Sequence, residues 1–287
     1  MKKSLIFAVV IIIFIAILTL LFYSNPMKLH KDTNQTPLKR LDDVPRAYWS
    51  KLADKRIFFG YQSVGYNIID GIRDLIDEHD FIKLNIVETT DPAALDQPVF
   101  AHARVGKNTQ PTSKIDHFRD IMDTGMGDKV DIAFLKFCYV DVTRDSDPNK
   151  IITNYKKTVD DLILRYPKTR FLHVTVPVSS APTGVKFALK ELIKSLIGKR
   201  GVLDDNIKRQ QYNVLLSNTY AKKQNMFDLA LTETIDPDGF RHFVEKDGEK
   251  TFVMVNQYTE DGGHLNKQGR RKVAEQLLIK LAGMANH

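Results

Sequence analysis

The sequence predicts an α/β fold, a three-layer α/β/α sandwich in which helices cover both faces of a mainly parallel sheet. Two observations support this prediction. Short apolar runs alternate with segments of helical periodicity, and these runs are nearly continuous rather than alternating apolar with polar residues. Continuous apolar strands are typical of parallel sheets, because helices bury both of their faces. With 287 residues, 43% of them hydrophobic, the chain is long enough for one large core.

The elements follow in order along the chain. A strand is expected at 56–61, and a helix at 64–78, where Val64, Ile68 and Leu75 recur at helical spacing. Further strands are expected at 81–88, 130–137, 170–177 and 226–229. Further helices are expected at 115–122, 151–165, within 186–197, within 204–223 and at 267–281. Residues 236–258 interrupt the alternation, and the pairable runs 240–244 and 251–255 predict an inserted hairpin.

The amino-terminal segment is expected to cross a membrane. Leu5 to Tyr23 is an apolar run in which Thr19 is the only clearly polar residue. As a helix this run spans roughly 28 Å, close to the thickness of a bilayer core. No small-x-small cleavage site follows it, so residues 1–24 are predicted to be an uncleaved signal anchor. Residues 25–45 are then a tether, and 46–287 a domain outside the cytoplasm, in a bacterial envelope.

The net charge of +7 gives little support to nucleic-acid binding. Residues 1–40 carry five of these net charges, and the remainder of the chain is nearly neutral. A basic cluster beside an apolar helix suits anionic lipid headgroups better than phosphodiesters. A single cysteine, Cys138, excludes an intramolecular disulfide. No phosphate-binding or dinucleotide fingerprint occurs, so no cofactor is expected.

Ser63 is the first candidate catalytic residue. It follows the expected strand 56–61 and directly precedes the expected helix 64–78. A serine on such a turn lies at the carboxyl edge of the sheet, close to helix amides that can stabilise an oxyanion. Serine is also a common N-cap residue, so a purely structural role remains open.

Asp261 and His264 form the second candidate group, in the loop before the last helix. A histidine can take a proton from serine and return it to a leaving group, and an aspartate can orient the histidine. Gly262 and Gly263 permit close backbone approach beside them. A surface turn or a helix cap is the alternative for this Asp-x-x-His pattern.

Together, Ser63, Asp261 and His264 resemble the SGNH/GDSL hydrolase superfamily over roughly residues 52 to 284, with a flavodoxin-like sheet. The resemblance implies that Ser63 is the nucleophile, His264 the general base and acid, and Asp261 its orienting partner. One block departs from the pattern, because Gln62 precedes the serine where the family usually has Gly-Asp-Ser.

The same resemblance implies an oxyanion hole, for which Gly106 and Asn108 are the candidates. The block after the strand 130–137 matches poorly. Cys138 falls at the family's glycine, Val140 at its asparagine and Asp141 at its aspartate, and valine has no side-chain donor. Either Asn108 replaces the missing amide, or the catalyst is weakened.

The function predicted on this basis is a membrane-anchored serine esterase that works through an acyl-enzyme. O-acylated cell-surface polysaccharide is the expected substrate class, from the resemblance and the location. An O-acyltransferase of the same fold is the alternative, as is a non-catalytic module that binds or assembles envelope carbohydrate.

Other reactive side chains receive structural interpretations. Cys138 and His173 are expected to be buried and packed, and His102 and His117 to lie in exposed loops. Lys136 in an apolar strand either points into the cleft or reaches a sheet edge. No metal site is expected, because Asp236, Asp238, Asp261 and His264 lack a recognised ligand spacing.

Overall fold

A parallel sheet forms the centre of the protein in a computed structural model that describes residues 29–181, 202–220, 225–246 and 248–286. Its five strands lie in the order β3-β4-β2-β5-β6. Their bounds are Ile86–Glu88 (β3), Val99–Arg104 (β4), Arg56–Tyr61 (β2), Ile132–Leu135 (β5) and Arg170–Phe171 (β6). β3 and β4 lie on one side of β2, and β5 and β6 lie on the other, so the order of the strands reverses at β2. Ligands bind at such switch points, beyond the carboxyl ends of the strands.

A separate two-stranded sheet follows β6 along the chain. Only Leu172 separates β6 from β7 (His173–Val174), and β7 pairs in parallel with β8 (Met226–Phe227). The residues of β2 alternate between two cores, since Ile57 and Phe59 face one cluster and Phe58 faces the other. Both faces of this central strand are therefore buried, which explains its uninterrupted apolar sequence.

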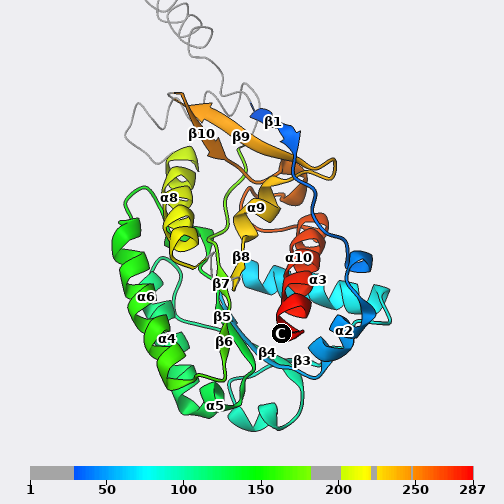
Figure 1. Cartoon of the computed structure of the whole chain (residues 1–287). Coiled ribbons are helices and arrows are strands. Elements are labelled where there is room, and N and C mark those ends of the chain that lie inside the picture. Colours follow the sequence, from blue (N-terminus) through cyan, green and yellow to red (C-terminus); the bar gives the residue numbers. More distant parts are fainter. Residues whose placement is uncertain (1–28, 182–201, 221–224, 247, 287) are drawn as a thin grey trace, which may run out of the picture.

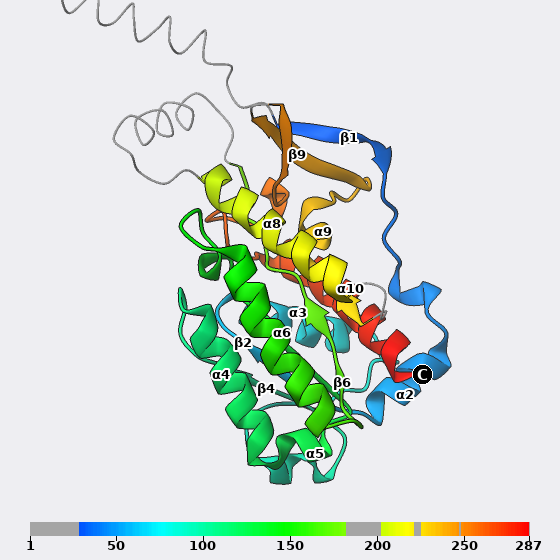
Figure 2. The same ribbon diagram turned by 60° about the vertical axis from the view of Figure 1, so that its left-hand side comes forward.

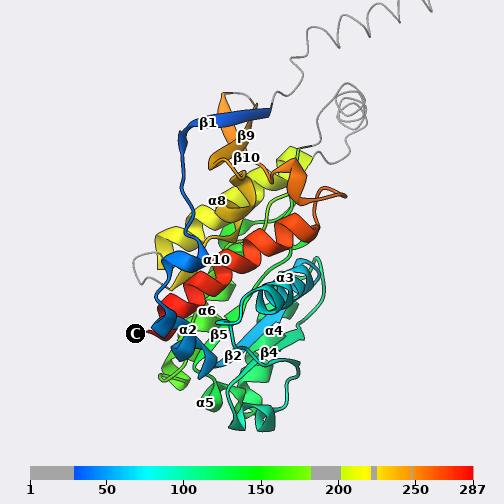
Figure 3. The same cartoon turned by 90° about the vertical axis from the view of Figure 1, so that its right-hand side faces the viewer.

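Helices cover both faces of the sheet (Figures 1 and 3). On one face, α10 (Lys267–Ala285) packs against α3 (Val64–Glu78) and α2 (Arg46–Ala53). On the other, α6 (Pro148–Arg165) lies between α4 (Pro111–Ile121) and α8 (Val202–Tyr220). Two short helices, α5 (Gly127–Lys129) and α9 (Leu229–Thr234), complete the connections. The structure is thus mixed α/β, with helices on both sides of a parallel sheet.

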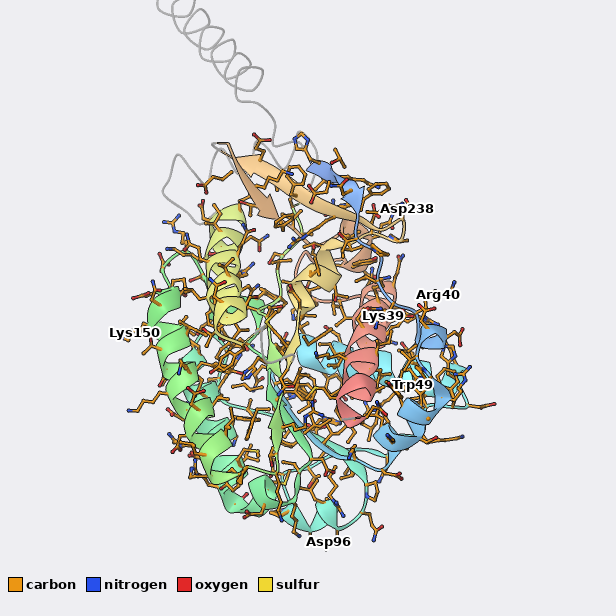
Figure 4. All side chains as sticks on the ribbon, viewed as in Figure 1. Lys39, Arg40, Trp49, Asp96, Lys150 and Asp238 are labelled. Atoms are coloured by element: carbon orange, nitrogen blue, oxygen red, sulfur yellow. The ribbon has the colours of Figure 1, made fainter. Side chains whose placement is uncertain are left out.

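A small antiparallel sheet lies beyond the carboxyl ends of the parallel strands (Figure 2). Its order is β1-β9-β10, with bounds Leu29–Gln35, Phe240–Lys246 and Glu249–Phe252. Figure 4 shows Asp238 beside this sheet and Asp96, which precedes β4, at the opposite end of the molecule. The strands β9 and β10 form a hairpin within residues 236–258. The described part of the expected tether contributes β1, whose backbone pairs with β9 from Leu29 to Gln35.

Some elements differ from the sequence predictions. Val99–Arg104 is a strand that the sequence analysis missed, because His102 and Arg104 interrupt its apolar pattern. The strand expected at 81–88 is reduced to Ile86–Glu88. α2 and α9 are also additional, while β2 and α3 have the predicted bounds.

Two predicted elements lie outside the described residues. They are the membrane-spanning helix of residues 1–24 and the helix within 186–197. In the part of the chain that is described, no helix combines the length and apolarity needed to cross a bilayer.

Candidate active site

Ser63 lies in the turn between β2 and α3. Its backbone has a φ of 49° and a ψ of −100°, a left-handed φ that residues with a side chain rarely adopt. Backbone strain of this kind clusters at functional sites. Ser63 occupies the N-cap position of α3, but its side chain makes no capping hydrogen bond. The Ser63 hydroxyl therefore does not cap α3, which was the structural role that the sequence left open.

The hydroxyl of Ser63 contacts His264 instead. Ser63 Oγ lies 2.5 Å from His264 Nε2, and His264 Nδ1 lies 2.6 Å from Asp261 Oδ2. The three residues come from two loops separated by about two hundred positions, which the sheet and α10 bring together. The arrangement is that of a nucleophile, a base and the carboxylate that orients the base.

Asp261 is held by the backbone of its own loop. Its Oδ1 accepts hydrogen bonds from the N–H groups of Gly263, at 2.9 Å, and His264, at 2.8 Å. Partial burial acts to raise the pKa of this carboxyl, but the hydrogen bonds from His264 and Gly263 outweigh it and keep the pKa below its ordinary value. Asp261 is therefore ionised at neutral pH and can stabilise a protonated imidazole.

Tyr139 forms one wall beside the histidine and was not identified from the sequence. Its ring meets that of His264 edge-on, with 5.6 Å between the centroids. A Cβ atom at Gly263 would lie 2.6 Å from Tyr139 Cζ, so only glycine allows this approach. The pair of glycines in the loop is the sequence signal that a side chain packs against it.

The loop 105–108 is attached to the residue before the nucleophile. Gln62 Nε2 donates to the carbonyl oxygen of Gly106, at 2.9 Å, and to that of Val105, at 3.3 Å. The N–H of Gly106 donates to His117 Nδ1, at 2.9 Å. This N–H is already bound, so Gly106 has no free N–H for the oxyanion role expected of it.

Asn108 is held by a buried ion pair. Lys114 Nζ donates to Asn108 Oδ1, at 2.9 Å, and also binds Asp141 Oδ2. The side chains of Lys114 and Asp141 are fully buried. Because its oxygen is bound to the ammonium, the Asn108 amide turns its NH₂ group the other way, and this donor has no partner in the described chain.

Asp141 ties this loop to the end of β5. It accepts from the N–H of Thr109, at 2.9 Å, and from that of Cys138, at 2.6 Å. Val140, in the adjacent turn, offers no side-chain donor, as the sequence indicated. The sequence analysis missed the ion pair, because Lys114 is one polar residue among many on an amphipathic helix.

Other candidates have structural surroundings. Cys138 is a buried free thiol, and buried His173 contacts the Tyr155 hydroxyl through Nδ1, at 3.0 Å. The prediction of an exposed loop is wrong for His102, which is buried in β4 with its Nδ1 2.9 Å from the Tyr61 hydroxyl. Burial lowers its pKa to about 4, so it is neutral at pH 7. His117 is exposed, as expected, but it lies in α4 and not in a loop.

Asp236, considered for a metal site, contacts neither Ser63 nor His264. Asp236 binds Lys31 Nζ at 2.6 Å and His242 Nε2 at 3.0 Å. No cluster of three or more metal-ligating side chains occurs within the described ranges. Lys136 takes neither of the two positions considered, since it is buried below the serine turn with its Nζ 3.3 Å from the Gln62 carbonyl.

A cavity of about 830 Å³ begins at Thr109, the residue after Asn108. Its lining includes Thr109 and Asp141 and continues along the first turns of α4 and α6 to Asn149 and Lys150. Most of the exposed lining surface is apolar, and hydroxyl, amide and ammonium groups project from it.

Comparison with known proteins gives structural matches only. No protein-family model and no curated protein sequence matches the chain. A Streptococcus pneumonia protein described as a platelet activating factor is similar in structure, with 15% identity, a TM-score of 0.46, and coverage of 82% of this chain and 89% of that one.

Two further structures carry informative descriptions. A lipolytic protein of the G-D-S-L family from Desulfitobacterium hafniense has 11% identity and a TM-score of 0.39, over 77% of this chain and 96% of its own. The periplasmic domain of a Salmonella ser. Paratyphi A lipopolysaccharide acetyltransferase has 13% identity and a TM-score of 0.40, over 78% and 83%. At these identities and TM-scores the likeness carries no argument about family or activity, which have to come from this chain's own atoms.

Proposed function

We propose that this protein is a serine esterase that cleaves acyl esters through an acyl-enzyme. The observation that carries the proposal is the contact of Ser63 with His264 and of His264 with Asp261, at 2.5 and 2.6 Å. A structural cap or a surface turn requires neither contact. The buried pair that holds Asn108 and the strained backbone of Ser63 add support, because both cost energy that a binding module has no need to spend.

Ser63, His264, Asp261 and Asn108 divide the steps of the reaction between them. His264 Nε2 takes the proton of Ser63 Oγ while the oxygen attacks the ester carbonyl, and Asp261 stabilises the imidazolium. The N–H of Ser63 and the NH₂ of Asn108 donate to the oxyanion. His264 then protonates the leaving alcohol, which departs as the carbonyl re-forms. Water, deprotonated by His264, attacks the acyl-serine, and His264 returns that proton to Ser63 Oγ as the ester bond breaks and the acid is released.

Hydrolysis fits the site better than transfer to a second alcohol. The His264 side chain is 44% exposed and that of Asp261 is 56% exposed. Water therefore reaches the position from which the acyl-enzyme is attacked, and an acyltransferase has to exclude it. An O-acyltransferase stays the alternative, with the cavity that begins at Thr109 as the site for its acceptor.

The same cavity supports a polar, polyhydroxylated substrate. Its largely apolar lining carries hydroxyl, amide and ammonium groups that can hydrogen-bond a sugar, and it starts at Thr109, the residue after Asn108 in the chain. Together with the apolar run from Leu5 to Tyr23, this favours an O-acylated polysaccharide of a bacterial envelope, reached by a membrane-anchored enzyme.

Turnover of p-nitrophenyl acetate by the full chain tests the proposal. Ser63→Ala is expected to abolish turnover, and the exposed serine variant Ser50→Ala to retain it. A fluorophosphonate probe is expected to label Ser63 in the parent and nothing in Ser63→Ala. A folded parent that neither turns over the ester nor takes the label would favour the carbohydrate-binding module instead.

A further inference from the structure

Lys136 carries a buried ammonium group close to the nucleophile. It follows β5, its backbone N–H donates to the Gly60 carbonyl at 3.0 Å, and its side chain is fully buried. Within the described residues no carboxylate lies within 4.0 Å of Nζ. A buried charge without an ion-pair partner is costly, and such charges are concentrated at functional sites.

Within the described residues this ammonium makes one hydrogen bond, and it leads to the serine turn. Lys136 Nζ lies 3.3 Å from the carbonyl oxygen of Gln62, which also accepts from the N–H of Gly65. In a trans peptide the carbonyl and the following N–H point in opposite directions. The N–H of Ser63 therefore points away from Lys136. No described residue accepts a hydrogen bond from it.

We propose that Lys136 is a positioning residue that polarises the Gln62–Ser63 peptide and makes the Ser63 N–H a stronger oxyanion donor. Hydrogen bonds in a chain polarise one another, and the effect is largest in a low-dielectric interior. The ammonium acts through the peptide and does not touch the substrate. The inference rests on the proposed esterase function and adds a charge that the resemblance to SGNH hydrolases does not imply.

Four ionisable groups surround Lys136. Cys138 and Asp141 come from the segment after β5, Lys114 from α4 and Glu233 from α9. Burial lowers the pKa of Lys136 to about 8, helped by Lys114 and opposed by the other three groups. Glu233 is also buried, with Oε2 bound to the Val178 N–H at 2.9 Å and Oε1 unpartnered, and burial raises its pKa to about 8.

These pKa values define the charge of Lys136 and the pH range in which that charge changes. Lys136 is protonated at pH 7 and loses its proton as the pH rises through about 8. The polarising charge is lost with it, so kcat should fall on the alkaline side. When Glu233 ionises in the same range, its negative charge helps Lys136 to keep the proton.

The experiment is a pH profile of kcat and KM for p-nitrophenyl acetate, with the full chain, from about pH 6 to about pH 10. Lys136→Met is expected to lower kcat at pH 7 about tenfold, with KM unchanged, and to remove the alkaline decrease. Lys136→Arg is expected to recover most of kcat and to show no decrease above pH 8, because guanidinium stays protonated. Glu233→Gln is expected to move the decrease to lower pH.

The outcomes separate this inference from the function on which it rests. Unchanged kcat in folded Lys136→Met, or a flat alkaline side in the parent, overturns the role of Lys136. If circular dichroism shows that Lys136→Met does not fold, Glu233→Gln decides, and an unmoved alkaline decrease overturns the proposal. Turnover that survives Ser63→Ala would overturn the esterase function itself.

Discussion

The described part of the protein contains two aspartate–histidine pairs with similar distances and different surroundings. Asp261 Oδ2 and His264 Nδ1 are 2.6 Å apart, and Asp236 Oδ2 and His242 Nε2 are 3.0 Å apart. The first pair is about half exposed. The side chains of His242 and Asp236 are only 9% and 5% exposed, and the carboxylate also binds Lys31.

The two pairs differ in which ring nitrogen the carboxylate takes. Asp261 binds Nδ1 and leaves Nε2 to face the Ser63 hydroxyl. Asp236 binds Nε2, and Nδ1 of His242 is buried without a partner. An aspartate beside a histidine is therefore not sufficient for chemistry. The free nitrogen has to face a nucleophile and be reachable by substrate, and the second pair instead links β1 to β9.

Exchanging each histidine for alanine gives the largest expected contrast. His264→Ala should lower kcat by about a millionfold, because the serine loses its base. His242→Ala should leave kcat within about twofold and lower the free energy of unfolding by about 1 to 3 kcal/mol, because it opens a buried site. Ester turnover and urea unfolding measure both effects. Loss of turnover in a folded His242→Ala variant would contradict the different roles of the two pairs.

The carboxylate of the active pair should have the next largest effect. Asp261→Asn is expected to lower kcat about ten-thousandfold, because the imidazolium loses its counter-charge and the imidazole its orientation. The neighbouring exposed Glu260→Gln removes the same charge without that contact and serves as the matched control. Equal activities of the two variants would contradict the role of Asp261.

Asn108→Ala tests the oxyanion donor that the ion pair holds. One missing donor should lower kcat about a hundredfold with KM little changed. Lys107→Ala, an exposed change in the same loop, should retain activity. If steady-state kinetics give both variants the parent kcat, the donor has to be sought elsewhere than at Asn108.

The smallest effect concerns acid stability and belongs to the structural pair. Burial acts to raise the pKa of Asp236, but the hydrogen bonds from Lys31 and His242 outweigh it and lower the pKa from 3.8 to about 2. A lowered carboxyl pKa stabilises the folded protein above about pH 4, and this stability is lost as the pH falls towards 2. The contribution is about 2 kcal/mol. Urea unfolding at pH 5 and pH 3 should show this loss in the parent and a smaller one in Asp236→Asn, and equal losses would contradict the assignment.

The central part of the fold was predictable because its signals are local. The strand 56–61 and the helix 64–78 have the predicted bounds, since buried parallel strands are continuously apolar and a covering helix shows its own periodicity. β4 was missed because the burial of His102 depends on the Tyr61 hydroxyl, a partner 41 residues away. β1 was missed for a similar reason, as its pairing partner β9 lies about two hundred residues further along the chain.

By itself, the sequence predicted the class of fold and selected Ser63, Asp261 and His264 as candidates, because short patterns at strand ends and before the last helix carry that information. Only the tertiary structure decided which of its aspartate–histidine pairs faces the serine. It also decided that the Gly106 amide is occupied, that Lys114 and Asp141 hold Asn108, and that Lys136 lies beneath the nucleophile. These are contacts between residues distant in sequence, and their energies depend on burial and on the direction of individual donors, which no local pattern encodes.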